Sequence, residues 1–244
     1  MTKPSPAPVR SSLGLRLVHA AVFLAFAAAA TVAALPEWRH GLDVLGRAYH
    51  VGTPPRAVLV LGSVLAVAGA SSLLFSLLRN RSAPMVASWL ILGGLVASIV
   101  GTAGSPEPER PTEVAANTAL IQLGQRVQVA MVSQLQERGE VPVALGPWQH
   151  ALERVAPPGR FRTRGFRAVP PQVVAVATPE ALPAPLLPGA LLLHVSSDGA
   201  SFELRLVGLS QGEPQVLRDE TGAPVVLRGL FNPSLPATPA RSLP

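Results

Sequence analysis

The hydrophobic residues gather in three long runs in the first part of the chain, at residues 17–35, 57–78 and 85–103. The second and third runs contain no charged residue and, as helices, are long enough to cross a hydrocarbon core about 30 Å thick. A few residues around Arg79 and Arg81 separate them, which predicts a helical hairpin. A soluble fold would have to bury two helices that are apolar on every face, so the pattern predicts a membrane protein.

The first run, Leu17–Leu35, has two interpretations. A basic start, an apolar core and small residues near its end are typical of a cleaved secretory signal peptide. However, the run is longer than a usual signal core, and Pro36, Glu37 and Trp38 after it are typical of a membrane interface. We favour a retained helix, which makes residues 17–103 a region of three transmembrane helices and residues 36–56 a connection.

Small residues recur at every fourth position along these runs: Ala21, Ala25 and Ala29; Gly62, Ala66 and Ala70; Gly93, Ala97 and Gly101. Such stripes let helix backbones approach closely in lipid, although helices rich in alanine and glycine also produce them by chance. We expect the stripes to lie at helix–helix contacts.

The second half of the chain has the alternating pattern of a folded domain. Thr112 is a cap for a helix that ends near Arg138, with one apolar face made by Leu120, Leu123, Val127, Ala130, Met131 and Gln134. The β-rich runs bounded by turn residues lie at 173–178, 191–196, 202–208, 214–217 and 224–228. The pattern predicts an α+β domain at residues 112–231, with one amphipathic helix packed on a small antiparallel sheet.

The remaining segments are rich in proline and polar residues. We expect residues 1–16 to form a disordered basic terminus, residues 104–111 to form a linker and residues 232–244 to form a disordered tail.

The basic residues near the apolar runs predict an orientation. Lys3, Arg10 and Arg16 precede the first run, and Arg79 and Arg81 lie in the hairpin turn with no acid beside them. Basic flanks stay in the cytoplasm, so three crossings place the N-terminus inside and the C-terminal domain outside. A single lysine among 20 basic residues, with many alanines, prolines and glycines, indicates a GC-rich bacterial genome and hence the inner membrane.

Charge and composition narrow the classes of function. Residues 1–103 carry eight basic residues against two acids, whereas residues 104–244 carry twelve of each, so the excess of +6 belongs to the membrane part and does not indicate a nucleic-acid partner. The absence of cysteine excludes disulfides, thiol nucleophiles and cysteine-bound metal. We expect no cofactor.

The candidate contact site is the segment GRFRTRGFR, residues 159–167. In an extended segment Arg160, Arg162 and Arg164 share one face, and Arg167 follows. Their forked donors suit phosphate or carboxylate, which predicts contact with anionic lipid headgroups, an acidic polysaccharide or an acidic protein. The alternative is a solvated face paired with the acids of the domain itself.

Other polar residues have simpler explanations. His194, Ser196 and Asp198 resemble a hydrolase triad in type, but their spacing along the chain favours a hairpin turn. Trp148 and His150 could line a pocket, although a packed tryptophan on a short helix at 147–154 is the better interpretation.

The histidines of the first half are also candidates. His19 could relay protons within the membrane, but it lies one turn from Arg16 and can reach the headgroups. His40, His50 and Asp43 could ligate a metal, although their spacing fits no close metal motif and favours surface positions.

A family resemblance emerges from the order of these segments. A hydrophobic helix, an amphipathic helix ending in Gly139-Glu140-Val141-Pro142, a loop and a meander through SSDGASFELRLVG resemble the layout of type IV pilins and type II secretion pseudopilins, over about residues 85–228. The resemblance implies a helix packed on an antiparallel sheet that serves assembly or protein contact and not catalysis. The chain departs from the family because no prepilin processing site, with a glycine before Phe or Met, precedes Met85.

Together these features predict a non-enzymatic bacterial inner-membrane protein whose extracytoplasmic domain contacts another envelope component. The alternative is a membrane-embedded accessory subunit of a transporter or membrane enzyme complex, in which the helices make the contacts.

Overall fold

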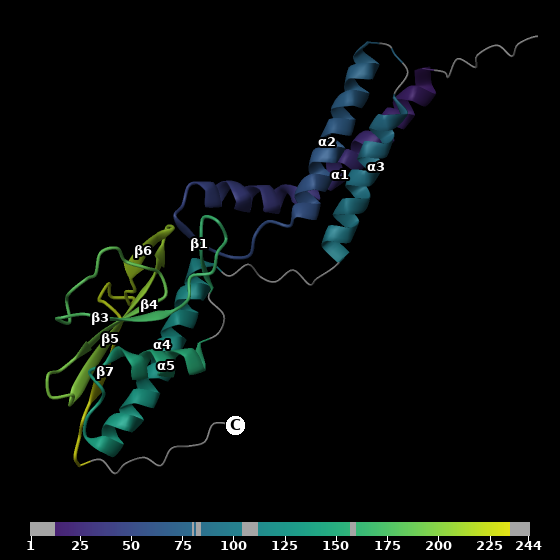
Figure 1. The fold of residues 1–244 in the computed structure, drawn as a ribbon. Coiled ribbons are helices and arrows are strands. Elements are labelled where there is room, and N and C mark those ends of the chain that lie inside the picture. The colour runs from purple at the N-terminus through teal and green to yellow at the C-terminus, as the bar shows by residue number, and fades with distance from the viewer. Residues whose placement is uncertain (1–12, 80, 82–83, 104–111, 157–159, 235–244) are drawn as a thin grey trace, which may run out of the picture. The chain divides into compact units, whose positions relative to one another are not determined.

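The structure is a computed structural model that describes residues 13–79, 81, 84–103, 112–156 and 160–234 (Figure 1). The predicted linker 104–111 and most of the predicted disordered ends, 1–16 and 232–244, lie outside these residues. The chain forms two compact units. The first contains residues 1–43 and 54–108, and the second contains residues 44–53 and 109–244.

The first unit is built from α1 (Leu13–Leu45), α2 (Ala57–Leu78) and α3 (Met85–Ala103). All three are long and apolar enough to span a membrane, which indicates a multi-pass membrane protein. The bounds of α2 and α3 are those expected from the apolar runs. The first helix is longer than expected, because it continues through Pro36 for ten residues that we had assigned to a connection.

Tertiary contacts explain why α1 continues past a proline. The Trp38 indole N–H donates to Ser63 Oγ at 2.9 Å, and the Glu37 carboxylate accepts from the backbone N–H of Arg56 at 2.9 Å. Figure 1 shows α1 beside α2 and α3 along its first part and turned away from them in its last part. A proline inside a helix removes one backbone hydrogen bond and permits such a bend.

The contact between α2 and α3 is very close. An added Cβ at Gly94 would lie 2.5 Å from the carbonyl oxygen of Gly62, and one at Gly69 would lie 2.7 Å from that of Ala87. The buried positions of the two helices follow steps of four, three and four residues: Gly62, Ala66, Gly69 and Leu73 on α2; Ala87, Ile91, Gly94 and Ser98 on α3.

The predicted stripes of small residues are therefore only partly right. Gly62 and Ala66 are buried in the contact, but Gly93 is exposed and faces open space. On α1 the predicted Ala21, Ala25 and Ala29 are exposed, and Ala20, Ala27, Ala30 and Ala34 are buried instead. A strict four-residue spacing drifts by about 40° per step around a helix, so a contact seam must alternate steps of three and four.

A polar clamp joins α1, at Glu37, to the start of α2 and the end of α3. Glu37 of α1 is buried and accepts from the N–H of Arg56, the residue that precedes α2. The Arg56 guanidinium donates in turn to the carbonyl of Gly101 in the last turn of α3 at 3.0 Å. An acid near a helix start and a cation at a helix end both complement the helix dipole, so this clamp stabilises the three-helix arrangement.

The second unit contains the long helix α4 (Glu113–Arg138). Thr112 caps it by accepting from the N–H of Ala115 at 3.1 Å, and Gly139 ends it in the left-handed conformation, as the sequence predicts. The buried face is Ala116, Leu120, Leu123, Gly124, Val127, Met131 and Leu135. Ala130, which the pattern places on this face, is exposed, and Leu135 one turn beyond Met131 is fully buried.

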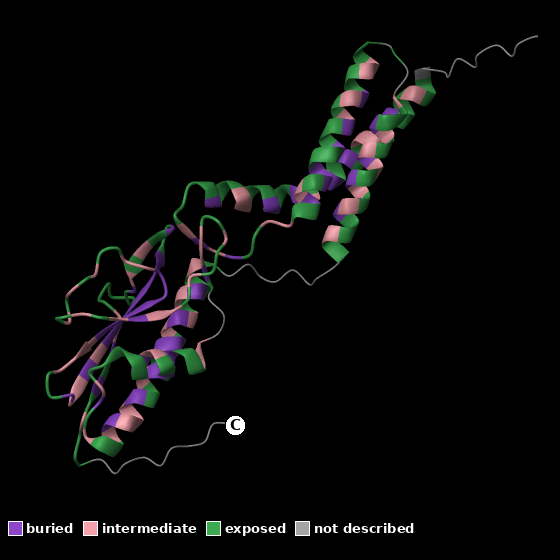
Figure 2. Ribbon diagram, in the orientation of Figure 1, coloured by how far each residue is buried: buried purple, intermediate pink, exposed green. Residues whose placement is uncertain are grey.

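A short helix and a mixed sheet complete the core. They are α5 (Leu145–Val155), β3 (Gln172–Ala175), β4 (Ala190–Val195), β5 (Ser201–Ser210), β6 (Glu213–Val216) and β7 (Val226–Leu230). The order is β3-β4-β5-β6, and β7 also pairs with β5. Residues of α4, α5 and the sheet share one hydrophobic core, and Figure 2 shows most of β4 and β5 as buried.

The sheet is not fully antiparallel, because β3 and β4 are parallel. The proline-rich segment between them therefore forms no hairpin. Val176 at the start of this segment and Leu186 near its end pack against Ala190, Leu192 and Val207 in a second apolar cluster. The segment thus carries the chain back to the start of β4, which a parallel pair requires.

A separate two-stranded sheet was not predicted. β1 (Tyr49–Val51), from the connection between α1 and α2, pairs antiparallel with β2 (Phe161–Thr163). Tyr49 and Val51 pack against the core of the domain. The folded domain therefore includes residues 44–53 and is larger than the predicted 112–231.

Candidate functional site

The arginine-rich segment folds as a small hairpin that begins with β2. The N–H of Phe166 donates to the Thr163 carbonyl at 2.8 Å, and the N–H of Thr163 donates to the Arg167 carbonyl at 2.9 Å. The extended part thus covers only Phe161–Thr163, and Arg164 lies in the turn. The prediction that three arginines share one face of a strand is wrong, because the chain reverses direction after Thr163.

The aromatic residues of the segment hold the hairpin to the domain. Phe161 is buried in the main core. Phe166 has a φ of 60° and packs edge-on against the His50 ring, with ring centres 4.7 Å apart. These contacts explain why the hairpin has a defined conformation although it carries four arginines.

Two of the four arginines hold the hairpin through hydrogen bonds to backbone carbonyls, and the other two lie on its surface. Arg162 is half-buried and donates to the Phe166 carbonyl at 2.9 Å, and Arg164 donates through Nε to the Arg47 carbonyl at 3.2 Å. Arg160 and Arg167 are exposed. Within the described part of the chain, the ion pairs join other residues, Arg47 with Glu113 and Arg228 with Glu203.

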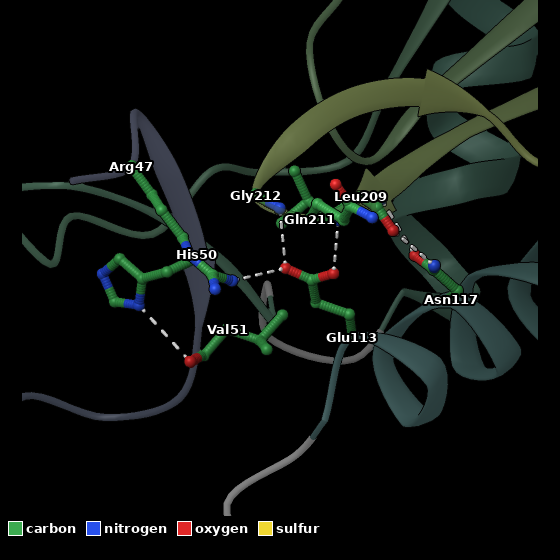
Figure 3. A network of polar contacts seen from close by, with 8 residues as sticks. All are labelled: Arg47, His50, Val51, Glu113, Asn117, Leu209, Gln211 and Gly212. Atoms are coloured by element: carbon green, nitrogen blue, oxygen red, sulfur yellow. Dashed lines mark hydrogen bonds and ion pairs between the residues drawn. The ribbon is translucent and has the colours of Figure 1, made fainter. Parts of the chain in front are cut away.

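The connection that carries β1 is anchored by a network around Glu113 (Figure 3). The Glu113 carboxylate accepts from Arg47 Nη1 at 3.1 Å and from the backbone N–H groups of Gln211 and Gly212, both at 2.9 Å. Glu113 is the first residue of α4, where a negative charge also complements the helix dipole. One carboxylate thus joins the connection that follows α1, the start of α4 and the turn between β5 and β6.

The turn itself requires its glycine. Gln211 and Gly212 have φ values of 54° and 82°, as in the tight turns that favour glycine in hairpins. An added Cβ at Gly212 would also lie 2.6 Å from Arg47 Cδ. Beside the turn, the Asn117 amide donates to the Leu209 carbonyl at 2.8 Å and accepts from its N–H at 3.1 Å.

Sequence reasoning missed this network. Ser210-Gln211-Gly212-Glu213 between two β-rich runs is a visible turn signal, and Glu113 follows a helix cap. No local pattern, however, shows that the turn, the helix start and Arg47 come together, because Glu113 is 66 residues from Arg47 and 98 residues from Gln211 in the chain.

The Ser196 and Asp198 pair is a hairpin turn, as predicted. Ser196 Oγ donates to Asp198 Oδ1 at 2.6 Å, and the N–H of Ala200 donates to the same oxygen at 3.1 Å. The Ser196 hydroxyl is the larger cause that lowers the pKa of Asp198 from its ordinary value, followed by the Ala200 N–H. His194 lies against the Val176 carbonyl instead of Ser196, so the three residues do not form a nucleophile and base.

Trp148 is a core residue, as predicted. Its ring is fully buried on α5 and packs edge-on against Phe202, and its N–H donates to the Pro142 carbonyl at 2.8 Å. His150 on the same helix is exposed. The two side chains therefore do not line a common pocket.

The histidines of the first half also make structural contacts. His19 Nε2 lies 3.2 Å from Ser88 Oγ on α3, and the His50 ring is buried against Phe166. Among the residues that the structure describes, no three His, Asp or Glu side chains come together as a metal site.

Comparison of the chain with protein-family models, with curated proteins and with solved structures finds no match.

Proposed function

We propose that the chain is a non-enzymatic protein of the bacterial inner membrane whose extracytoplasmic α+β domain contacts another envelope component, in an assembly, scaffold or sensor role. One observation supports it most: the loop between the first two apolar helices contributes a strand to the domain, so the domain is tied to its own membrane region through β1 as well as through the chain after α3. A domain tied in this way has a fixed side of the membrane on which to meet a partner.

The pairing of β1 with β2 supports the predicted topology. Residues 49–51 and 161–163 must lie on the same side of the membrane to pair. The two strands lie on the same side if α2 and α3 both cross the membrane. They lie on opposite sides if only one of these helices crosses it. Arg79 and Arg81, at the other end of the α2–α3 hairpin, favour the cytoplasm there, which leaves the domain outside.

The β7 edge of the sheet favours contact through side chains over the addition of a strand there. Gln128 and Gln136 of α4 donate to the carbonyls of Arg228 and Leu230 on β7 at 2.7 and 3.1 Å. These carbonyls are the groups that an added strand would use, and capped edges resist such pairing. A pilin-like packing of α4 and neighbouring residues against a partner is the mode that we propose.

Site-specific photo-crosslinking in intact cells tests the proposal. Probes at Val129 on α4 and Leu182 in the proline-rich segment are exposed on the domain, and probes at Leu61 and Ile99 are exposed on the apolar helices. We expect a discrete protein adduct from the domain positions. Protein adducts from Leu61 or Ile99 alone would contradict the proposal and support the accessory-subunit alternative.

One observation favours that alternative, a membrane-embedded accessory subunit of a transporter or enzyme complex. A shallow, mostly apolar groove of about 350 Å³ lies between α1 and α2, lined by Thr31, Trp38, Ser63, Val64, Val67 and Ala68. Such a groove could receive a helix of a larger complex.

A further inference from the structure

The last part of α1 carries an exposed apolar stripe. Trp38, Leu42 and Leu45 are 40%, 63% and 65% exposed, and their spacing places them on one helix face. The exposed charges of Arg39 and Asp43 lie at intervening positions. A helix with an apolar stripe and a charged face, next to a membrane-spanning segment, is suited to lie in the plane of the membrane interface.

The arginine hairpin is tied to the residues that directly follow this stripe. The Arg164 N–H donates to the Ala48 carbonyl at 2.9 Å, and its guanidinium donates to the Arg47 carbonyl. Ala48 is the third residue after Leu45, which limits the distance between their Cα atoms to about 11 Å. Chain length alone therefore keeps the turn of the hairpin close to the level of the stripe.

The hairpin concentrates positive charge, and its own stretch of the chain contains no acid. No Asp or Glu occurs between Glu153 and Glu180, and the arginines at 160, 164 and 167 are exposed. Guanidinium groups bind phosphate through paired hydrogen bonds. Stable attachment to a membrane surface commonly combines an apolar insertion with a basic patch. Here the apolar stripe ends three positions before Ala48, which the basic hairpin contacts through the Arg164 N–H.

We propose that the hairpin at residues 160–169 binds the headgroups of anionic phospholipids at the surface of the membrane that the chain's own helices span. This contact orients the domain relative to the lipid surface. This proposal requires only that the helices span a membrane. It does not depend on which side of the membrane the domain lies or on which protein the domain contacts.

The absence of cysteine gives a direct assay on the full-length protein. Gly165 lies in the hairpin turn, and an added Cβ there meets only Thr163 Oγ1 at 3.9 Å, so Gly165→Cys can carry a fluorophore. The labelled protein is reconstituted in nanodiscs of phosphatidylcholine. Small amounts of phosphatidylglycerol or phosphatidylcholine with a headgroup quencher are then added, and the ratio of quenching by the two lipids gives the preference for anionic lipid.

The test variant is Arg160→Gln with Arg167→Gln, because Arg162 and Arg164 hold the hairpin itself. The matched control is Arg126→Gln with Arg138→Gln, which removes two exposed arginines from α4. A basic residue at an anionic surface contributes enough for the preference to fall about fivefold for each arginine removed. We expect this loss in the test variant and little change in the control.

Four results would overturn the proposal. The first three are equal quenching by the two lipids in the unmodified hairpin, a preference that does not weaken as salt is raised, and an equal loss of preference in the control variant. Circular dichroism of each variant shows whether the fold is retained. A fully folded test variant that keeps the full preference for phosphatidylglycerol also contradicts the assignment.

Discussion

Replacing Glu113 with alanine should release the anchor that holds residues 44–53 to the domain. The carboxylate accepts three hydrogen bonds, from Arg47, Gln211 and Gly212. Removing it leaves the buried Gly212 N–H without an acceptor, whereas the exposed Gln211 N–H can return to water.

The loss of free energy in Glu113→Ala follows from the exposure of each group that the carboxylate binds. A buried donor left unpaired costs about 1–3 kcal/mol, and the Gln211 bond contributes about 0.5–1.5 kcal/mol. The Arg47–Glu113 pair is 43% and 23% exposed, so it contributes less than about 1 kcal/mol. The sum is about 2–4 kcal/mol for local opening, or about a 30- to 700-fold loss of amide protection.

Hydrogen exchange by mass spectrometry on the reconstituted protein measures this loss in peptides that cover residues 44–53 and 208–214. Glu140→Ala, which removes an exposed carboxylate beyond the end of α4, is the control. Glu113→Gln keeps one acceptor oxygen and should give an intermediate result. Unchanged protection in Glu113→Ala, or an equal loss in the control, would refute the assigned role of this carboxylate.

Two further predictions concern other parts of the chain. Gly94→Ala places a methyl group against the Gly62 carbonyl, so in detergent denaturation it should be less stable than Gly93→Ala, which faces open space, by about 1–3 kcal/mol. The lowered pKa of Asp198 means that the β4–β5 turn is fully stabilised above the ordinary pKa of 3.8 and loses this stabilisation as pH falls through the lower folded value. Amide exchange at Ala200, followed through that pH range, should therefore show faster opening in acid, and Asp198→Asn should remove this pH dependence.

The features that the sequence predicts correctly are those that residues close together in the chain determine. The α2 and α3 runs are uninterrupted and end at polar residues, so their bounds agree with the structure. The cap at Thr112 and the stop at Gly139 are likewise local chemistry. The turn at Ser196–Asp198 was recognised for the same reason.

The features that were missed depend on distant partners. β1 and β2 are three residues each and lie more than a hundred residues apart, so neither has a periodic pattern of its own. The parallel pairing of β3 with β4 depends on how the proline-rich segment packs, which periodicity does not encode. The helical segment after Pro36 is held by Ser63 and Arg56, which lie on a later part of the chain.

The arginine-rich segment combines a feature that the sequence predicts with one that it does not. Its composition marked it as a contact site, but its conformation depends on the burial of Phe161 and on the pairing of β2 with a strand from the first connection. Because the chain turns at Arg164, the exposed arginines are Arg160, Arg164 and Arg167, and not the set Arg160, Arg162 and Arg164 that an extended strand predicts.

The pairing of β1 with β2 on the outer side of the membrane is the central claim, and one engineered disulfide tests it. Tyr49 and Thr163 are opposite each other, next to the pair that the Arg164 N–H and the Ala48 carbonyl join. They therefore form a non-hydrogen-bonded pair, with Cα atoms about 4.5 Å apart, which suits a disulfide.

The measurement is the gel mobility, without reductant, of Tyr49→Cys/Thr163→Cys in an otherwise cysteine-free chain, with Tyr49→Cys/Val143→Cys as the unpaired control. We predict that the bond between the paired positions forms spontaneously in intact bacterial cells, because the periplasm is oxidising, and that the control stays reduced. A bond that forms only after the cells are broken and an oxidant is added would contradict the outer location. No bond under either condition would contradict the pairing itself.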